Sequence, residues 1–435
     1  MKIVIIGGGA AGMSAASKAK RISPDDDVEV IEGGSFVSYA ECGIPYYLAG
    51  KFDDYKKLIH YPIDEFTKKR NINVRIKTKV MSIDLQNRVI TTLDGDNIQF
   101  DKLVICTGAS ARKSKFSNFP NVFSVRNLDD AIRIKGENGG KDILVIGDGI
   151  LGMELASEFA MNEKNVTLMS KHSYLFPKLD QNVVQEMIAD FNSRVKVILN
   201  SEVKEITSAN SKLQVQSDNY TVNVDSVFFT AGITPNTDFL KNSGIRIDKN
   251  GLIEVNSRME TNVDGVYAAG DCATSLNRIT GRSEWQPLAQ IANKMGRVAG
   301  SNASGKIMEF KGGLDTTLLK IFDYEVGLCG FNEKQAEENG FSPEWKIVSG
   351  KSRANYYDGG SKLMVKIVYD KNTLKLLGGQ ICSKDNGAWR LNTLETAIFA
   401  GMTTEDLFYN DLGYTPPFGP VWDPIIIAAS LTMRD

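Results

Sequence analysis

"KIVIIGGGAAGMSAAS" (residues 2–17) and "DILVIGDGILGMELAS" (residues 142–157) are two versions of one pattern, and this repetition decides the fold. In each version an apolar run rich in β-branched residues leads into GxGxxG and then into a helical pattern, as in a strand, a phosphate-binding turn and a helix. A single GxGxxG is weak evidence, because a glycine-rich turn is often only a turn. Two copies, both between a strand and a helix, indicate an internal duplication and two dinucleotide-binding domains.

The three glycines of each turn have separate roles in binding a dinucleotide. The first permits the tight turn, the second lets the backbone approach a pyrophosphate, and the third lets the helix pack on its strand. The N-terminus of the helix then faces the phosphates. The residues expected to contact the cofactors in these turns are Gly7, Gly9, Ala11 and Gly12 in the first copy and Gly147, Gly149 and Gly152 in the second.

The strands that follow the two turns end differently. "VEVIEGG" ends on Glu32, whose carboxylate can accept hydrogen bonds from ribose hydroxyls, whereas "NVTLMSKH" has Ser170 at the equivalent position, followed by Lys171 and His172. A carboxylate there would repel a 2′-phosphate, while a hydroxyl and a cation attract it. We therefore predict FAD at the first site and NADPH, in preference to NADH, at the second. The alternative is that Lys171 and His172 belong to a solvated loop.

Two further segments are predicted to be buried strands next to the turns. "DKLVICTGA" (101–109) ends in a glycine turn, where Thr107 and Gly108 are candidate cofactor contacts. "DSVFFTAGITPN" (225–236) is its counterpart in the second copy. The duplication thus extends beyond the glycine-rich turns.

Polar residues near these strands are candidates for contacts to the cofactors. "TNVDGVYAAGDCA" (261–273) places Asp271 at a strand end, where its carboxylate can accept hydrogen bonds from the ribityl chain of FAD. A helical pattern from about residue 286 to residue 299 would direct its positive end at the flavin pyrimidine. Glu154 is either a contact to the nicotinamide or an ordinary surface glutamate.

Length and composition limit the function classes. The 435 residues exceed a single core and predict two to four domains. A formal net charge of −2, without long runs of either sign, gives no indication of binding to nucleic acid or to an anionic membrane. The five cysteines lie far apart without a Cys/His cluster, which argues against a disulfide framework and against a metal site. With an apolar strand expected from residue 3 and no apolar run long enough to span a membrane, we expect a cytoplasmic protein.

These motifs, in this order and over essentially the whole chain, resemble those of the FAD-dependent pyridine nucleotide-disulfide oxidoreductases. The resemblance implies an α/β fold class with two Rossmann-like domains and an α+β C-terminal dimerisation domain. It also implies a homodimer with active sites shared across the interface. The implied boundaries are 1–111 and 239–309 for the discontinuous FAD domain, 112–238 for the NAD(P)H domain and 310–435 for dimerisation.

Cys42, in "SYAECGIPYYLAG" (38–50), distinguishes the branches of this family. The glutathione reductase branch uses CxxxxC, but Tyr47 stands at the second position here, and no histidine follows His172. The SxxxC pattern of Ser38 and Cys42 resembles the single-cysteine branch, which includes coenzyme A disulfide reductase, NADH oxidase and NADH peroxidase. Peroxide- and oxygen-reducing members carry a histidine in the first glycine-rich turn. The turn "GGGAAG" lacks it and resembles the coenzyme A disulfide reductases instead.

The resemblance extends to residues that would handle coenzyme A. "ANYYDG" and "GYTPPFGPVWDP" resemble tail segments that bring Tyr356 and Tyr414 across the dimer to the active cysteine, although Tyr357 could be the partner instead of Tyr356. A phenol is a sensible proton donor to a leaving thiolate. The phosphates of coenzyme A need cations, and the candidate substrate-binding residues are Lys18, Arg21, Ser38 and Arg70. His60 and His172 are expected to be structural.

The mechanism that follows uses one sulfur. NADPH reduces the flavin, which reduces a resting Cys42–S–S–CoA bond, and the Cys42 thiolate then attacks coenzyme A disulfide, persulfide or polysulfide. Tyr414 would protonate the leaving thiolate while Tyr356 holds it. Two alternatives remain: an NADH oxidase or peroxidase that cycles through a sulfenic acid, and a flavoprotein that donates electrons to a protein partner.

Overall fold

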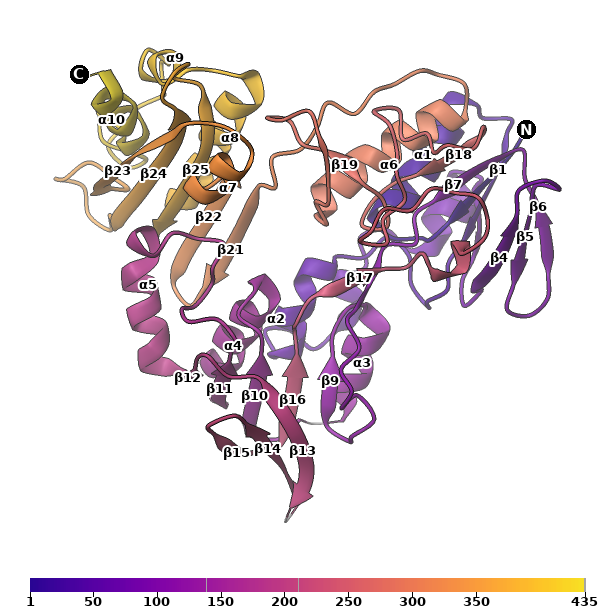
Figure 1. The fold of residues 1–435 in the computed structure, drawn as a ribbon, viewed down its shortest axis with the longest axis horizontal. Helices are drawn as coiled ribbons and strands as arrows, with labels where there is room; N and C mark the ends of the chain where they lie inside the picture. The colour runs from indigo at the N-terminus through magenta and orange to yellow at the C-terminus, as the bar shows by residue number, and fades with distance from the viewer. Residues whose placement is uncertain (138, 210, 434–435) are drawn as a thin grey trace.

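The structure is a computed structural model that describes residues 1–137, 139–209 and 211–433. Three five-stranded sheets divide the molecule into three parts, with the first parallel sheet at the right of Figure 1, the second parallel sheet below and the C-terminal antiparallel sheet at the upper left. The predicted fold class, an α/β protein with two Rossmann-like domains and an α+β C-terminal domain, is confirmed.

The first sheet consists of parallel strands in the order β18-β7-β1-β2-β3. Its central strand β1 is buried along nearly its whole length, as its continuous apolar sequence requires. β18 pairs with β7 although the whole second sheet lies between them in sequence. The bounds are β1 Lys2–Ile6, β2 Asp27–Ile31, β3 Asn73–Arg75, β7 Lys102–Ile105 and β18 Val266–Ala268, and a small antiparallel sheet is formed by β4 Val80–Asp84, β5 Val89–Thr92 and β6 Asn97–Gln99.

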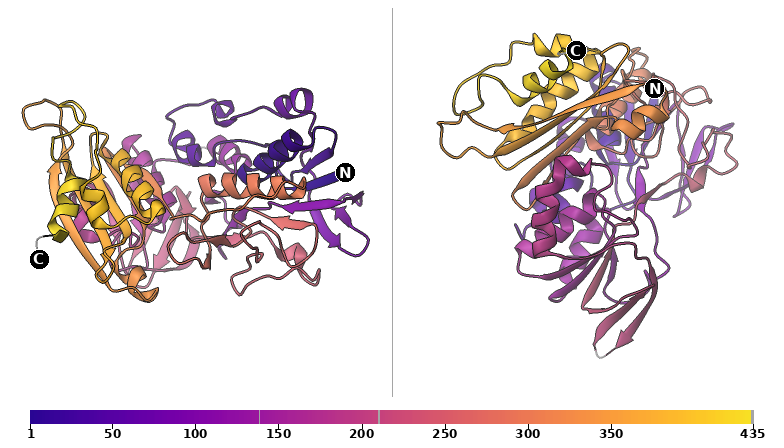
Figure 2. Two further views of the ribbon diagram at one scale, coloured as in Figure 1. Left: turned by 90° about the horizontal axis from the view of Figure 1, so that it is seen from above. Right: turned by 60° about the vertical axis from the view of Figure 1, so that its left-hand side comes forward.

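Two helices of the first domain pack with their backbones in contact. α1 (Ala10–Ile22) and α6 (Ala289–Ala303) lie side by side (Figure 2). A Cβ atom at Gly296 would lie 2.1 Å from the carbonyl oxygen of Ala11, and one at Gly300 would lie 2.2 Å from that of Ala15. Glycine is therefore required at both positions of α6 for this close approach.

α6 begins later than the sequence pattern predicts. The expected start near residue 286 is wrong, because Gln286 is buried and its side chain accepts a hydrogen bond from the hydroxyl of Ser275 (3.0 Å). Leu288, the residue before the helix, has an extended backbone. The side-chain contact of Gln286 and the extended backbone of Leu288 delay the helix until Ala289.

The second parallel sheet repeats the strand order of the first. Read as β9-β16-β10-β11-β12, it places β10 at the centre, as β1 is in the first sheet. This equivalence confirms the internal duplication. The bounds are β9 Val122–Ser124, β10 Asp142–Ile146, β11 Asn165–Met169, β12 Lys196–Ile198 and β16 Ser226–Phe229, with helices α3 Leu128–Gly136, α4 Ile150–Met161 and α5 Gln181–Arg194 and a small antiparallel sheet of β13 Val203–Ala209, β14 Lys212–Ser217 and β15 Thr221–Val224.

The chain crosses between the two parallel sheets twice, and the crossings are joined. β8 (Ala109–Ala111) leaves the first sheet and pairs in antiparallel fashion with β17 (Ile233–Pro235), which returns to it. Next to this pair, the hydroxyl of Thr107 donates to the carbonyl of Asn236 (2.7 Å), and the Asn236 amide donates to the carbonyl of Thr107 (2.9 Å). The two crossings therefore form one structural unit.

The C-terminal sheet is antiparallel, in the order β21-β22-β25-β24-β23. The predicted strands at 362–370 and 375–383 and the predicted helices at 391–401 and 422–431 are confirmed, with bounds that differ by two residues at most. No helix within the described ranges is both long and apolar enough to cross a membrane. The bounds are β21 Thr317–Ile321, β22 Tyr324–Gly330, β23 Pro343–Lys351, β24 Lys362–Asp370 and β25 Leu376–Ser383, with helices α7 Glu333–Glu338, α8 Leu391–Ala400, α9 Thr404–Phe408 and α10 Pro424–Ser430.

A buried lysine joins the C-terminal domain to the second domain. Lys366 on β24 is 1% exposed, and its ammonium lies 2.7 Å from a carboxylate oxygen of Asp180, the residue that precedes α5. The same ammonium lies 2.5 Å from Glu333 and 4.4 Å from the ring centre of Trp345. The cation is thus surrounded by two carboxylates and an aromatic face, which together replace its lost hydration.

Replacing Lys366 with methionine should therefore destabilise the protein. The carboxylates of Asp180 and Glu333 are 23% and 39% exposed and can be rehydrated, so the cost should be that of losing charged hydrogen bonds, about 1.5 to 3 kcal/mol. Lys362→Met is the matched control, since Lys362 also lies on β24 and pairs with Glu186 of α5, but is half exposed; its loss should cost less than about 1 kcal/mol. Urea denaturation measures both free energies of unfolding, and equal values for the two variants would contradict the role assigned to Lys366.

Candidate active site

Cys42 follows a loop that is bonded to the first glycine-rich turn. It occupies a 3₁₀ turn, Glu41–Gly43, directly before the short helix α2 (Ile44–Leu48). The loop before it is bonded to the glycine-rich turn, because the amide of Ser38 donates to the carbonyl of Gly8 (3.0 Å). Ser38 itself has a left-handed backbone (φ 50°). The SxxxC pattern therefore marks a loop that the fold holds against the first dinucleotide-binding turn.

Cys42 differs from the other cysteines in exposure. All five are free, and Cys42 is exposed while the others are buried. Burial of the thiol by the surrounding protein, together with the carboxylates of Glu154 and Glu41, raises the pKa of Cys42, and Arg126 partly opposes this. In the chain without cofactors, these surroundings favour the thiol over the thiolate.

Arg126 connects the Cys42 turn to Asp271, and sequence reasoning missed it. Its guanidinium lies 3.3 Å from Glu41 and 2.7 Å from Asp271, and its Nε donates to the carbonyl of Ala109 (2.8 Å). Burial raises the pKa of both Glu41 and Asp271, and Arg126 opposes the shift in each. One guanidinium therefore holds three segments that are far apart in sequence.

Glu154 on α4 faces the same region as Cys42. It is half-buried, and burial together with the nearby charge of Glu158 raises the pKa of Glu154 to about 7. Glu158, one turn further along α4, is buried and lies 3.5 Å from the ammonium of Lys51. Burial, Glu154 and Glu158 also raise the pKa of Tyr46, on α2, to about 12. Glu154 thus lies in a partly desolvated cluster with Cys42 and Tyr46.

The first glycine-rich turn fits an anionic dinucleotide. A Cβ atom at Gly9 would have no heavy atom within 4 Å, whereas one at Gly12 would lie 1.8 Å from the carbonyl oxygen of Gly7. Gly9 directly precedes α1 and has no side chain to cap it, so the first amides of the helix face this open space. Glu32 accepts hydrogen bonds from the amides of Gly8 and Gly34, both at 2.6 Å. These features suit the predicted FAD site.

The other predicted FAD contacts lie around this turn. Ala11 is buried against α6, and Gly108 has a left-handed backbone (φ 64°) beside the crossing of the chain. Asp271 is largely buried and accepts from Arg126, while its carbonyl accepts from the indole of Trp285 (3.1 Å). The structure thus gathers residues from both parts of the discontinuous first domain around one turn.

The second glycine-rich turn has the same open geometry. A Cβ atom at Gly149 would again have no heavy atom within 4 Å, and one at Gly152 would lie 2.0 Å from the carbonyl oxygen of Gly147. α4 begins at Gly149 without a side-chain cap. The turn therefore fits the phosphates of a second dinucleotide.

Beside this turn, a buried carboxylate organises the residues predicted to bind the 2′-phosphate. Asp148 lies 2.8 Å from Nδ1 of His172 and accepts from the amide of Phe176 (3.2 Å). The amide of His172 donates to the hydroxyl of Ser170 (3.0 Å), which is buried, while Lys171 is exposed. Asp148 thus holds His172 in place, and no motif in the sequence indicates this contribution of Asp148.

The candidate cations for the substrate lie on one surface of the first domain. The guanidinium of Arg70 donates to the hydroxyl of Ser17 on α1 (3.0 Å) and lies 4.8 Å from the ring centres of Tyr61 and Phe66. Lys18 follows Ser17 directly, and Arg21 lies exposed one turn later.

The neighbouring loop connects this surface to Ser38. The ring of His60 packs against Tyr61 at 4.4 Å between centres, and the amide of His60 donates to the carbonyl of Ser38 (2.8 Å). Pairwise contacts through His60, Tyr61 and Arg70 therefore connect Ser38 to α1.

The two tyrosines meet in the C-terminal domain. The hydroxyls of Tyr356 and Tyr414 lie 3.4 Å apart, and both side chains are exposed. The hydrogen bond with Tyr356 raises the pKa of Tyr414. The pairing falls on Tyr356, while Tyr357 stacks near the guanidinium of Arg353 (5.9 Å). Within the described part of the single chain, the two tyrosine hydroxyls contact each other, whereas Cys42 is surrounded by Glu41, Arg126 and Glu154. No group of three or more potential metal ligands occurs among the described residues.

Comparison with known proteins places this geometry in a family. The pyridine nucleotide-disulphide oxidoreductase family model matches residues 1–296, and the dimerisation domain model of the same family matches residues 317–424. The chain is 37% identical to an "NAD(P)H sulfur oxidoreductase (CoA-dependent)" of Pyrococcus furiosus, with 98% of each chain covered. It is 28% identical to a coenzyme A disulfide reductase of Staphylococcus aureus, with 96% of each chain covered.

A solved structure agrees in fold. An NAD-dependent persulfide reductase from A. fulgidus matches with a TM-score of 0.95 and 31% identity, covering all of this chain and 83% of the other. Two family models thus cover most of the chain, and a full-length relative exceeds 30% identity. The chain therefore belongs to the pyridine nucleotide-disulphide oxidoreductase family.

Proposed function

We propose that this oxidoreductase uses NAD(P)H to reduce coenzyme A disulfide, or a coenzyme A persulfide or polysulfide, through Cys42 alone. The observation that carries the proposal is a single exposed cysteine, four residues after Ser38, which is bonded to the first glycine-rich turn, while the other four cysteines are buried. A lone thiol can complete a disulfide cycle only with a sulfur from a second molecule. The names of the relatives in Pyrococcus furiosus and Staphylococcus aureus support coenzyme A as the carrier of that sulfur.

We assign FAD to the first glycine-rich turn and NADPH to the second. When bound, FAD would supply the two-electron link between the nicotinamide and a disulfide at Cys42. Glu32, Thr107 and Asp271 would hold FAD together with the first turn, and Glu154 would contact the nicotinamide. The domains assigned to these roles are 1–111 with 239–309 for FAD, 112–238 for NADPH and 310–435 for dimerisation.

The chemistry of this chain's residues starts from the Cys42 thiolate. The thiolate attacks one sulfur of coenzyme A disulfide, so that a Cys42–S–S–CoA bond forms and the substrate S–S bond breaks. The leaving coenzyme A thiolate takes a proton from Tyr414, and Tyr356 positions that hydroxyl through their hydrogen bond. Lys18, Arg21 and Arg70 would bind the phosphates of coenzyme A. Ser38 would line the substrate site beside Cys42.

The proposal requires a homodimer in which the tyrosines of one subunit reach Cys42 of the other. The C-terminal domain carries several large exposed aromatic side chains, which supports a surface that a second copy covers. They include Trp389, Tyr409, Phe418 and Trp422. The dimerisation domain match supports the same assembly.

Mass spectrometry of the unreduced protein should find one coenzyme A disulfide-linked to Cys42. A reductant should remove the added mass, and Cys42→Ser should lack it and lose disulfide turnover while keeping FAD bound. A cysteine sulfenic acid without affinity for coenzyme A would instead assign an NADH oxidase or peroxidase. Turnover that requires an added protein would instead assign an electron donor.

Replacing Lys171 with alanine should weaken NADPH selectively. Loss of one charged contact to the 2′-phosphate should raise KM for NADPH roughly tenfold and leave KM for NADH unchanged. Lys178→Ala is the matched control, since Lys178 is an exposed lysine of the same loop that pairs with Asp315. The NADPH assignment would be refuted if the ratio of KM for NADPH to KM for NADH were the same in both variants and the wild type.

The pair of tyrosines should set the alkaline limit of turnover. Tyr414 donates a proton only below its pKa, and because Tyr356 raises this pKa, activity should persist above the phenol reference of about 10. Tyr356→Phe removes that hydrogen bond and should move the alkaline limb to lower pH. Tyr414→Phe should lower kcat by roughly 100-fold.

The exposed Tyr220, in the turn between β14 and β15 of the second domain, offers a control away from the proposed interface. Tyr220→Phe should leave both kcat and the pH profile unchanged. Steady-state kinetics with coenzyme A disulfide across the alkaline range tests all three variants. A wild-type profile for Tyr414→Phe would exclude Tyr414 as the proton donor.

A further inference from the structure

The paired tyrosines lie on two separate loops, and both tyrosine side chains are exposed. Residues 352–361, between β23 and β24, carry Tyr356, and residues 409–423, between α9 and α10, carry Tyr414. Tyr356 is 76% exposed and Tyr414 is 45% exposed. A cavity of about 460 Å³ lies against both loops, and Arg390, Gly413 and Phe418 are among the residues that line it. Packing of the tyrosine side chains therefore does not explain why their hydroxyls lie 3.4 Å apart.

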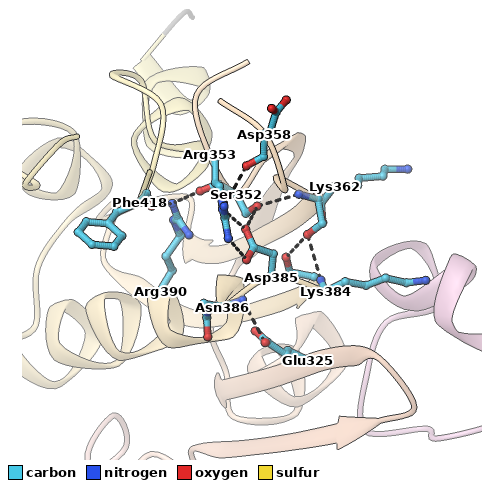
Figure 3. A network of polar contacts seen from close by, with 12 residues as sticks. Glu325, Ser352, Arg353, Asp358, Lys362, Lys384, Asp385, Asn386, Arg390 and Phe418 are labelled. Atoms are coloured by element: carbon cyan, nitrogen blue, oxygen red, sulfur yellow. Dashed lines mark hydrogen bonds and ion pairs between the residues drawn. The ribbon is translucent and has the colours of Figure 1, made fainter. Parts of the chain in front are cut away.

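Arg390 joins the two loops through three polar contacts, and Figure 3 shows those to Ser352 and Phe418. Its Nη2 atom donates to the carbonyl of Ser352, at the base of the first loop (3.0 Å). The same nitrogen donates to the carbonyl of Phe418 in the second loop (2.7 Å). Its Nε donates to the carboxylate of Asp423 (2.6 Å), the residue whose side chain caps α10. The side chain is only 14% exposed, so these contacts compete little with water.

Other contacts brace the first loop internally. Arg353 forms two hydrogen bonds to the carboxylate of Asp385 (2.7 and 2.8 Å) and donates to the carbonyl of Asp358 (2.9 Å) (Figure 3). The hydroxyl of Ser352 donates to the same carboxylate (2.8 Å). These contacts tie the base of the Tyr356 loop to Asp385 and to its own Asp358, while Arg390 connects it to the loop of Tyr414.

Direct contact between the loops is sparse by comparison. The amide of Ala354 donates to the carbonyl of Pro416 (3.1 Å). A single hydrogen bond between neutral backbone groups holds two loops together only weakly. The guanidinium contacts Ser352, Phe418 and Asp423 at once, so it constrains both position and orientation.

We propose that Arg390 is a positioning residue that aligns Tyr356 with Tyr414 and thereby prepares Tyr414 to protonate the leaving thiolate. The inference rests on the proposed function for the role of the proton, but the alignment itself is a property of this chain. Arg390 contacts the backbone carbonyls of Ser352 and Phe418 and the carboxylate of Asp423. Its effect on turnover would therefore pass through the tyrosine pair.

The test combines kinetics with a direct titration of Tyr414. Arg390→Met should lower kcat with coenzyme A disulfide by roughly 10- to 100-fold, because a small misplacement of a catalytic group costs about that much. KM for NADPH should not change. The alkaline limb of the pH profile of kcat should move to lower pH, as expected for Tyr356→Phe. The double variant with Tyr414→Phe should be no slower than Tyr414→Phe alone.

Titration of phenolate absorbance gives a readout that does not depend on activity. The difference between dimeric holoenzyme with and without Tyr414→Phe isolates the ionisation of Tyr414 among the 14 tyrosines. In the Arg390→Met background, the isolated Tyr414 titration should occur at lower pH, because the hydrogen bond with Tyr356 is weakened. The inference would be overturned if the Tyr414 titration and the pH profile were unchanged in Arg390→Met. In that case the fold losses of kcat for Arg390→Met and Tyr414→Phe would also multiply in the double variant.

Two further variants keep the test decisive. Arg390→Lys preserves the charge opposite Asp423 but cannot reproduce the planar set of donors, so it should fold and show an intermediate shift of the titration. If Arg390→Met fails to dimerise, a wild-type titration of Arg390→Lys would overturn the inference. Arg278→Met is the matched control, because Arg278 donates to a carbonyl of α8, Phe399 (2.9 Å), away from both loops, and should leave every readout unchanged.

Failure of the proposed function would look different. If Tyr414→Phe turns over coenzyme A disulfide like the wild type, Tyr414 is not the proton donor. The Tyr414 titration in the Arg390 variants would still decide whether the arginine aligns the pair.

Discussion

The contact between the start of a helix and the glycine-rich turn before it is the constraint on which both nucleotide-binding domains depend. At Gly12 and Gly152 a Cβ atom would overlap the carbonyl oxygen of the first glycine of the turn, so only glycine allows the helix to approach this closely. The close approach leaves the first amides of α1 and α4 without side-chain caps and directed into open space. Phosphate binding follows from backbone geometry, and the two domains differ mainly in the side chains placed around it.

Those features of the fold that depend on local sequence could be predicted. β-Branched runs, turn glycines and strand periodicity act over a few residues, which is why β24 occurs at the predicted residues. The start of α6 was missed, because the contact between Gln286 and Ser275 is tertiary. Ser38 and Cys42 were found through a motif, and Tyr356 and Tyr414 through the resemblance of the tail segments.

Arg126 and Asp148 could not be found in this way. Arg126 belongs to no motif, and its neighbours Glu41, Ala109 and Asp271 come together only in the folded chain. Asp148 occupies the first x of GxGxxG in the second turn, a position for which the motif specifies no residue type. The raised pKa of Cys42 was also unpredictable, since it results from burial and from Glu154 and Glu41 acting through space.

The paired crossings β8 and β17 have a consequence for biosynthesis. The first sheet lacks its edge strand β18, and α1 lacks its neighbour α6, until the ribosome has made the entire inserted domain. The second sheet, by contrast, is continuous in sequence and has all its strands when β16 emerges. During synthesis, the inserted second domain can therefore complete its sheet before the first domain does, although domains generally fold in order from the N-terminus.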